Sequence, residues 1–229
     1  MSDTFEIDPS DLRAFREATR EDVRRLFREF QQEFPRETFY VFGLFDYVDW
    51  SFPSLFYGAN TLQHWKAALS QKDDSTVDLP DEYYKWAAGQ WKCNGNLSSM
   101  SIVEEIIAKT GIDDLDPYDG ELDTAREVLQ YSVEVEMMLA LRELDTEHFF
   151  GQGEKRNAFL LTVSTEDEGA ASDWKHEVSA CLLNPDDVFR KFLVEFRRGN
   201  REELPDIDAQ IQQLKDTELA QRFYERLAS

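Results

Sequence analysis

TFYVFGLFDYV, residues 38–48, is the stretch that decides the fold. Aromatic and β-branched side chains fill both alternating sets of positions until Asp46, a pattern typical of a central strand that is covered on both faces. SLFYGAN, residues 54–60, follows the turn-forming segment DWSFP and has the pattern of an antiparallel partner. The sequence therefore predicts a β-hairpin within a larger sheet.

Helices are predicted on both sides of this hairpin. Residues 9–34 repeat apolar side chains at helical spacing, with Asp8 as the cap and Pro9 at the first helical position. Arginines and acids alternate on the other face of this helix, and we expect that face to be solvated. Further helices are predicted over residues 61–69, 81–93, 99–109, 119 or 123 to 144, 184–198 and, in two pieces, 206–228.

A second pair of strands is predicted over residues 156–165 and 176–183. Strands in two clusters with helices around them indicate the α+β class, with an antiparallel or mixed sheet of about four or more strands covered by helices. No linker rich in Pro, Gly or Ser divides the chain, so residues 1–229 are predicted to form a single domain. Its core is expected to contain Phe39, Val41, Leu44, Phe159, Leu161 and Val163.

The charge of the chain is strongly uneven. Residues 71–150 carry nineteen acidic and six basic side chains, a net charge of −13 out of the total of −22. Such a surface repels nucleic acid and anionic lipid headgroups and attracts basic proteins. We therefore expect a contiguous negative surface that binds a basic protein partner and binds neither nucleic acid nor membrane. Acidity that serves only solubility, or adaptation to salt, is the alternative.

The acids just before the predicted helix near residue 120 are the candidate partner-binding carboxylates. With Gly120 at the sixth position of an EF-hand loop, Leu115 and Pro117 would occupy ligand positions and Arg126 the twelfth, so the calcium-binding spacing is not met. Acids in this place also complement the positive end of a helix dipole. The candidates are Asp113, Asp114, Asp116, Asp119 and Glu121.

Aromatic residues are concentrated in DEYYKWAAGQWK, residues 81–92. On a helix Tyr84 and Trp91 share a face, and we expect this pair to be buried in the core. Tyr83 and Trp86 lie on a second edge that could stay accessible. Because Tyr and Trp are favoured at protein interfaces, these two residues are added to the candidate partner-binding site.

No local motif points to catalysis, a metal or a cofactor. None of the three histidines has a second His or Cys at ligand spacing, and neither a nucleophile elbow nor a phosphate-binding loop occurs. An enzyme would need residues from distant parts of the chain, and this alternative stays open. Cys93 and Cys181 are predicted to be reduced. With no secretory signal and no long apolar run, a cytoplasmic location is predicted.

Four blocks, in order, resemble the bacterial family known as domain of unknown function 4303. They are FYVFGLFDYVDWSFPSLFYGANTLQHW, YYKWAAGQW, FLLTVSTEDE and LLNPDDVF, and the resemblance extends over roughly residues 10–200. Trp86-Ala87-Ala88 departs from the Trp-Ser-Pro block of the family. The resemblance implies a small cytosolic bacterial protein, and some members are thought to accompany polymorphic toxins as immunity proteins. It implies no catalytic residue.

These observations together predict an acidic cytoplasmic binding module. Its partner would be a basic protein, and the resemblance favours an immunity-type neutraliser of a basic toxin. A small-molecule enzyme with a non-local active site is the main alternative. The sequence leaves the oligomeric state open.

Overall fold

A four-stranded mixed sheet lies at the centre of the computed structural model, which describes residues 5–49, 52–71, 80–88, 91–115, 120–165, 170–203 and 206–228. The strands are β1 (Phe39–Asp49), β2 (Phe52–Thr61), β3 (Cys93–Asn96) and β4 (Leu160–Thr165). Their order across the sheet is β3-β2-β1-β4. β1 pairs antiparallel with β2 and parallel with β4, and β3 pairs antiparallel with β2. The predicted hairpin and the α+β class are confirmed.

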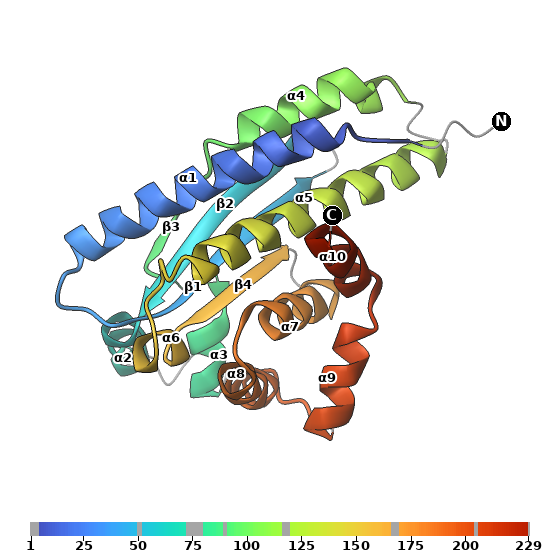
Figure 1. Cartoon of the computed structure of the whole chain (residues 1–229). Coiled ribbons are helices and arrows are strands. Elements are labelled where there is room, and N and C mark those ends of the chain that lie inside the picture. The colour runs from blue at the N-terminus through green and yellow to red at the C-terminus, as the bar shows by residue number, and fades with distance from the viewer. Residues whose placement is uncertain are drawn as a thin grey trace.

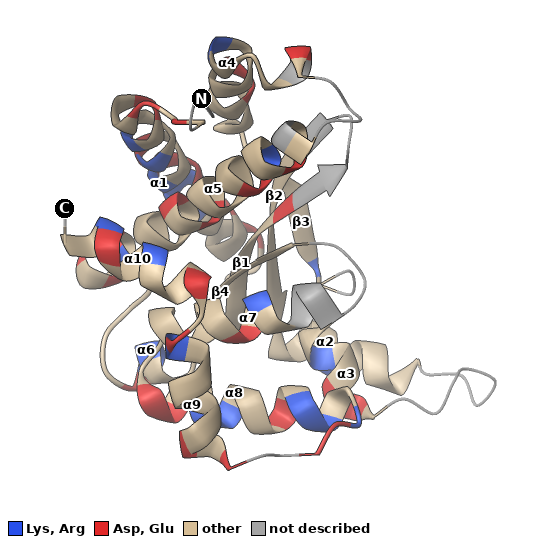
Figure 2. Ribbon diagram, turned by 90° about the vertical axis from the view of Figure 1, so that its right-hand side faces the viewer, with Lys and Arg blue, Asp and Glu red and all other residues tan. Residues whose placement is uncertain are grey.

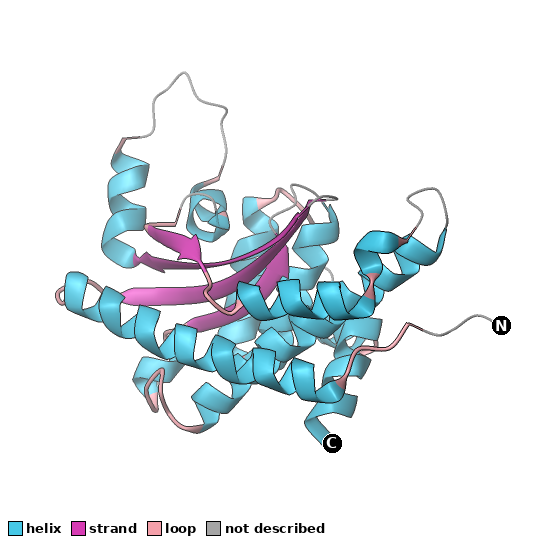
Figure 3. Cartoon of the chain, turned by 90° about the horizontal axis from the view of Figure 1, so that it is seen from above, coloured by secondary structure: helices cyan, strands magenta, loops and turns pink. Residues whose placement is uncertain are grey.

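Helices surround this sheet (Figure 1). The long helices α1 (Pro9–Glu33) and α5 (Gly120–Thr146) pack against each other, and both lie on one face of the sheet with α4 (Met100–Thr110) beside them (Figure 3). The other helical segments are α2 (Leu62–Ser70), α3 (Asp81–Trp86), the 3-10 turn η2 (Ile112–Asp114), α6 (Glu154–Asn157), α7 (Ala170–Leu183), α8 (Asp186–Gly199), α9 (Ile207–Lys215) and α10 (Glu218–Ala228).

The core contains the apolar residues that the sequence singled out. Leu44 and Leu161 are fully buried, and Phe39 is half-buried against the same cluster. On the α1 side, Phe27 forms an edge contact with Phe42, with ring centroids 5.8 Å apart. Aromatic contacts of this kind add to the burial of apolar area, so the α1 face of the sheet is well packed.

One predicted strand is a helix. Residues 176–183 lie in α7, which packs along the outer edge of β4. A short apolar run such as HEVSACLL does not distinguish a strand from a buried helix by its period, and the tertiary contacts decide. The outer edge of β4 pairs with side chains in place of a further strand. The amide of Val163 donates to Oγ of Ser179 over 2.9 Å, and the amide of Leu161 donates to Oδ1 of Asn184 over 2.8 Å.

Two of the predicted helices differ from the structure in where they begin or end. The helix predicted over residues 81–93 ends at Trp86, because Ala87 takes an extended conformation, and Cys93 begins β3. The helix predicted over residues 184–198 begins only at Asp186, with Pro185 at its cap position. The side chain of Asn184 is instead occupied by the edge of β4, where its Nδ2 atom donates to the carbonyl of Leu161 over 2.7 Å.

Candidate functional site

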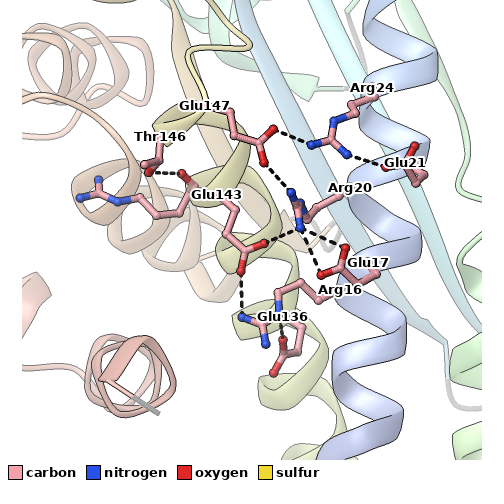
Figure 4. A network of polar contacts seen from close by, with 10 residues as sticks. Arg16, Glu17, Arg20, Glu21, Arg24, Glu136, Glu143, Thr146 and Glu147 are labelled. Carbon is pink, nitrogen blue, oxygen red and sulfur yellow. Dashed lines mark hydrogen bonds and ion pairs between the residues drawn. The ribbon is translucent and has the colours of Figure 1, made fainter.

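The arginine face of α1 is solvated only in part: Arg13, Arg25 and Arg28 are exposed, as the sequence predicted, whereas three other arginines are half-buried. Arg16, Arg20 and Arg24 point towards α5 and pair with acids of α5 and with Glu147, which directly follows it (Figure 4). Arg20 bridges two of them, with nitrogen atoms 3.1 Å from Glu143 and 2.6 Å from Glu147. The three half-buried arginines recur every four residues and so lie on one side of α1. Sequence separation hid this network, because its members are more than a hundred residues apart.

Glu136 is the most buried carboxylate of this network. It has no exposed side-chain surface, and its Oε2 atom lies 3.1 Å from Nε of Arg16. From the other side, Arg226 of α10 donates to its Oε1 atom from both Nε and Nη2, over 2.9 and 2.5 Å. A buried charge is tolerated only with such partners. Glu136 therefore links α1, α5 and α10.

The pairing divides the acidic region into two parts. In the second half of α5, Glu136 and Glu143 are neutralised by arginines of α1 and α10, so residues 71–150 do not form the contiguous negative surface that was expected over their whole length. At the other end of α5 the described acids are exposed and take part in no ion pair among the described residues. We call this group the acidic end; it comprises Glu104 of α4, Asp114 of η2, and Asp123 and Glu127 of α5.

η2 contacts both α4 and α5, and the acidic end extends from the first half of α4, which contains Glu104, through η2 to the first turns of α5 (Figure 2). Of the carboxylates predicted from sequence, Asp114 belongs to it and is exposed. Asp113 and Glu121 are placed by their backbones, in η2 and in the first turn of α5, respectively. Asp116 and Asp119 lie outside the described residues. Charges that face water keep their hydration and their long-range field, so this end can attract a basic surface.

The two aromatic candidates have different environments. Tyr83 is exposed, with 37% of its surface accessible, and its ring meets that of Tyr84 edge to face. Trp86 is buried, which contradicts the expectation that it is accessible. Its ring packs edge to face on Tyr40 and on Phe192 of α8, at centroid distances of 5.6 and 5.0 Å. Helix α3 presents Trp86 to the core because α8 lies against it.

A buried polar cluster near the carboxyl ends of β1 and β4 was missed by the sequence analysis. Asp46 of β1 accepts a hydrogen bond of 3.1 Å from Gln130, and Lys175 of α7 lies 2.5 Å from Glu134 of α5. The three charged residues are each more than nine-tenths buried. The available signal was Glu134 and Glu136 inside the apolar stretch SVEVEMMLAL, residues 132–141, where a charge requires a partner.

Burial and mutual charge shift the acidity of this cluster. Burial raises the pKa of Asp46 to about 6, and burial together with the charge of Asp46 raises the pKa of Glu134 to about 8, while Lys175 acts in the opposite direction on both. Two carboxyls in contact inside a protein share one proton in this way. Near neutral pH the cluster therefore holds one protonated carboxyl and one ion pair with Lys175.

His176, the neighbour of Lys175, does not extend this cluster as an acid or base. Burial lowers its pKa to about 4, so the imidazole is neutral, and it packs on the rings of Phe192 and Phe196 at centroid distances of 5.1 Å. Within the described residues no three His, Cys, Asp or Glu side chains come together as metal ligands.

A hollow of about 290 Å³ lies on the sheet beside β3. Its lining residues include the apolar side chains Phe45, Phe56 and Ala88, with Asn94 and Asn96 also among them. Among the described residues no charged side chain lines it, and Glu134 is not one of its lining residues. The hollow can hold an apolar side chain, and Tyr57 is the one titratable residue among its described lining residues.

Comparison with protein families identifies the family of this chain. Residues 16–185 match the family described as domain of unknown function DUF4303, and the chain belongs to this family. No curated protein and no solved structure matches the chain. The match ends close to the beginning of α8, although α8 to α10 pack on the same core. No helix within the described ranges is long and apolar enough to cross a membrane.

Proposed function

We propose that this protein is a binding module for a basic protein partner. The observation that supports the proposal is the division of the acidic residues: those of the second half of α5 are neutralised internally, whereas the acidic end of Glu104, Asp114, Asp123 and Glu127 is exposed. Charge that served only solubility would not need to be gathered on one end. An ordered arrangement of like charge costs self-repulsion, which an oppositely charged partner relieves.

In finer detail, we propose an immunity-type neutraliser that acts in the bacterial cytoplasm. Membership of the family is consistent with this role. Cys93 and Cys181 are free, and burial raises the pKa of each thiol to about 11, so both stay protonated and unreactive. Free thiols are the usual state in a reducing compartment.

The matched test compares two triple variants. One reverses three charges of the acidic end, Glu104→Lys, Asp114→Lys and Asp123→Lys. The other reverses the exposed acids Glu154, Glu203 and Glu225 on α6, the segment before α9, and α10. Both variants change the net charge by the same amount. Capture from native bacterial cytosol, followed by mass spectrometry, should yield basic proteins with the wild type and with the second variant, and fewer with the first.

Equal loss of these proteins in both variants would indicate attraction by net charge alone and would contradict the proposal. Recovery of only acidic or neutral proteins would also contradict it.

A small-molecule enzyme is the second candidate, and one observation favours it. The buried pair of Asp46 and Glu134 holds a proton near neutral pH, because burial and the charge of Asp46 raise the pKa of Glu134 to about 8, and a general acid requires such a proton. Glu134→Gln tests this function, because it removes the acid and keeps a similar shape. Loss of a turnover that the wild type shows, with capture of basic proteins unchanged, would place the enzyme candidate ahead.

A further inference from the structure

The outer edge of β3 offers unpaired main-chain groups. The amide of Leu97 donates to the carbonyl of Leu55 on β2 over 2.9 Å. Because hydrogen bonding alternates along an antiparallel strand, Gly95 and Cys93 also face β2, whereas the N–H and C=O groups of Asn94 and Asn96 point away from the sheet. Both asparagines are exposed, and no described strand pairs with this side of β3.

The two edges of the sheet are therefore different. At β4 the side chains of Ser179 and Asn184 bind the outward amides of Val163 and Leu161. At β3 no described group does so. An unpaired edge is a template for another strand, and proteins that do not use such an edge usually protect it. β3 is short, which limits uncontrolled association, but its edge stays open.

The hollow lies next to this edge and gives it side-chain selectivity. Asn94 and Asn96 line the hollow, and the rings of Phe45 and Phe56 stack within it at a centroid distance of 5.7 Å. A strand that paired with β3 would direct alternate side chains towards this face. One apolar or aromatic side chain of such a strand could then enter the hollow, while main-chain hydrogen bonds held the strand.

The charge around β3 favours a basic strand. The last turn of α1 contains no basic residue, and the charges of Glu33 and Glu37 are close enough to add to the burial that raises the pKa of Cys93. Lys92, which directly precedes β3, lies 2.5 Å from Glu37 and is partly neutralised by it. A second copy of the chain would bring a further charge of −22 to this edge, so self-association is disfavoured.

We propose that β3 is the docking edge for an extended, basic segment of a partner protein, which adds to the sheet as a fifth strand and places an apolar side chain in the hollow. This inference rests on the proposed binding function and assigns it a surface. The acidic end accelerates the encounter, and the edge of β3 holds the bound partner.

A peptide probe tests the edge without knowledge of the natural partner. The probe is a fluorescent heptapeptide in which lysine alternates with valine around a central phenylalanine. One control peptide carries proline at alternate positions and cannot pair, and another carries glutamate in place of lysine. We expect saturable binding of the first peptide and at least tenfold weaker binding of both controls.

Variants of β3 separate main-chain from side-chain recognition. Asn94→Pro and Asn96→Pro remove outward amide donors and leave the ladder to β2 intact, since proline is accepted on an edge strand. Asn94→Ala and Asn96→Ala shorten the side chains and keep the amides. Melting temperatures check that each variant is folded. The proline variants should bind the probe at least tenfold more weakly than the wild type, and the alanine variants less than threefold more weakly.

Amide exchange in the wild type provides a measurement that requires no variant. Binding of the probe should slow exchange at Asn94 and Asn96, while Gly95, which already pairs with β2, should change little. No saturable binding, or binding without protection of the outward amides, would overturn the edge proposal. Dimers that disappear in Asn94→Pro would identify a second copy as the occupant and overturn it as well. None of these results would affect capture of basic proteins through the acidic end, so the two proposals can fail separately.

Discussion

Nη2 of Arg226 lies 2.5 Å from Oε1 of Glu136, which joins the last helix of the chain to the middle of α5. Glu136 has no exposed side-chain surface, whereas Arg226 is partly exposed. Glu136 lies within the residues that match the family, whereas Arg226 lies beyond them. The ion pair of Arg226 with buried Glu136 therefore connects α10 to the part of the fold that matches the family.

Truncation of Arg226 should destabilise the protein. In Arg226→Ala, Glu136 keeps only Arg16 as a charged partner, and a lost hydrogen bond to a buried charge costs about 1.5 to 3 kcal/mol. Arg222→Ala is the matched control on the same helix, since Arg222 pairs with half-exposed Glu218 and should contribute less than about 1 kcal/mol. Urea unfolding measures the free energy of unfolding of both variants and of the wild type. Equal losses in the two variants would contradict the role given to Glu136.

Asn184 should be critical because it completes the edge of β4. Its side chain accepts from the amide of Leu161, donates to the carbonyl of the same residue, and donates to the carbonyl of Ala180 over 2.8 Å. Asn184→Ala leaves buried backbone groups without partners, each at a cost of about 1 to 3 kcal/mol. The exposed Asn157 is the control, and its replacement by alanine should have little effect on the thermal midpoint. A near-neutral Asn184→Ala would show that the edge is satisfied by water.

The pair of Asp46 and Glu134 predicts a loss of stability with rising pH. The pKa of Glu134 is raised to about 8 in the folded protein, so the folded state holds a proton that the unfolded state releases above its ordinary pKa of 4.5. The free energy of unfolding should therefore fall as the pH rises from about 4.5 to 8, and this contribution should be constant above that range.

Glu134→Gln removes that titration and should flatten the decline. Glu104→Gln, at an exposed position of α4, is the control and should follow the wild type. Urea unfolding between pH 5 and 9 provides the comparison. The same slope in wild type and Glu134→Gln would mean that Glu134 is ionised throughout and that no proton is shared.

The elements that the sequence predicts well are those whose pattern is local. β1 and β2 were predictable because apolar residues on both faces are required of a central hairpin, and α1 because its apolar stripe has a helical period. α7 was not predictable, since its eight-residue apolar run has no distinguishing period and its form depends on the edge of β4.

The candidate site was less predictable than the fold. The exposure of Tyr83 and the burial of Trp86 depend on where α8 lies, and sequence spacing does not specify this. The arginines of α1 have acids at local spacing, but their partners on α5 are fixed only by the packing of two long helices. Asp46, Glu134 and Lys175 come from three elements, and only burial brings their charges into contact.

The association rate tests the central claim, recognition of a basic partner through the acidic end, most directly. The captured partner is mixed with wild type and with the two triple variants by stopped flow at low and high salt. If the acidic end attracts the partner, the triple variant Glu104→Lys, Asp114→Lys, Asp123→Lys should slow association by more than tenfold at low salt. Charge reversal at Glu154, Glu203 and Glu225 should slow it much less. The difference between the two variants should disappear at 1 M salt, where the Debye length falls to about 3 Å. Equal rates for the two variants, or a wild-type rate that does not depend on salt, would contradict it.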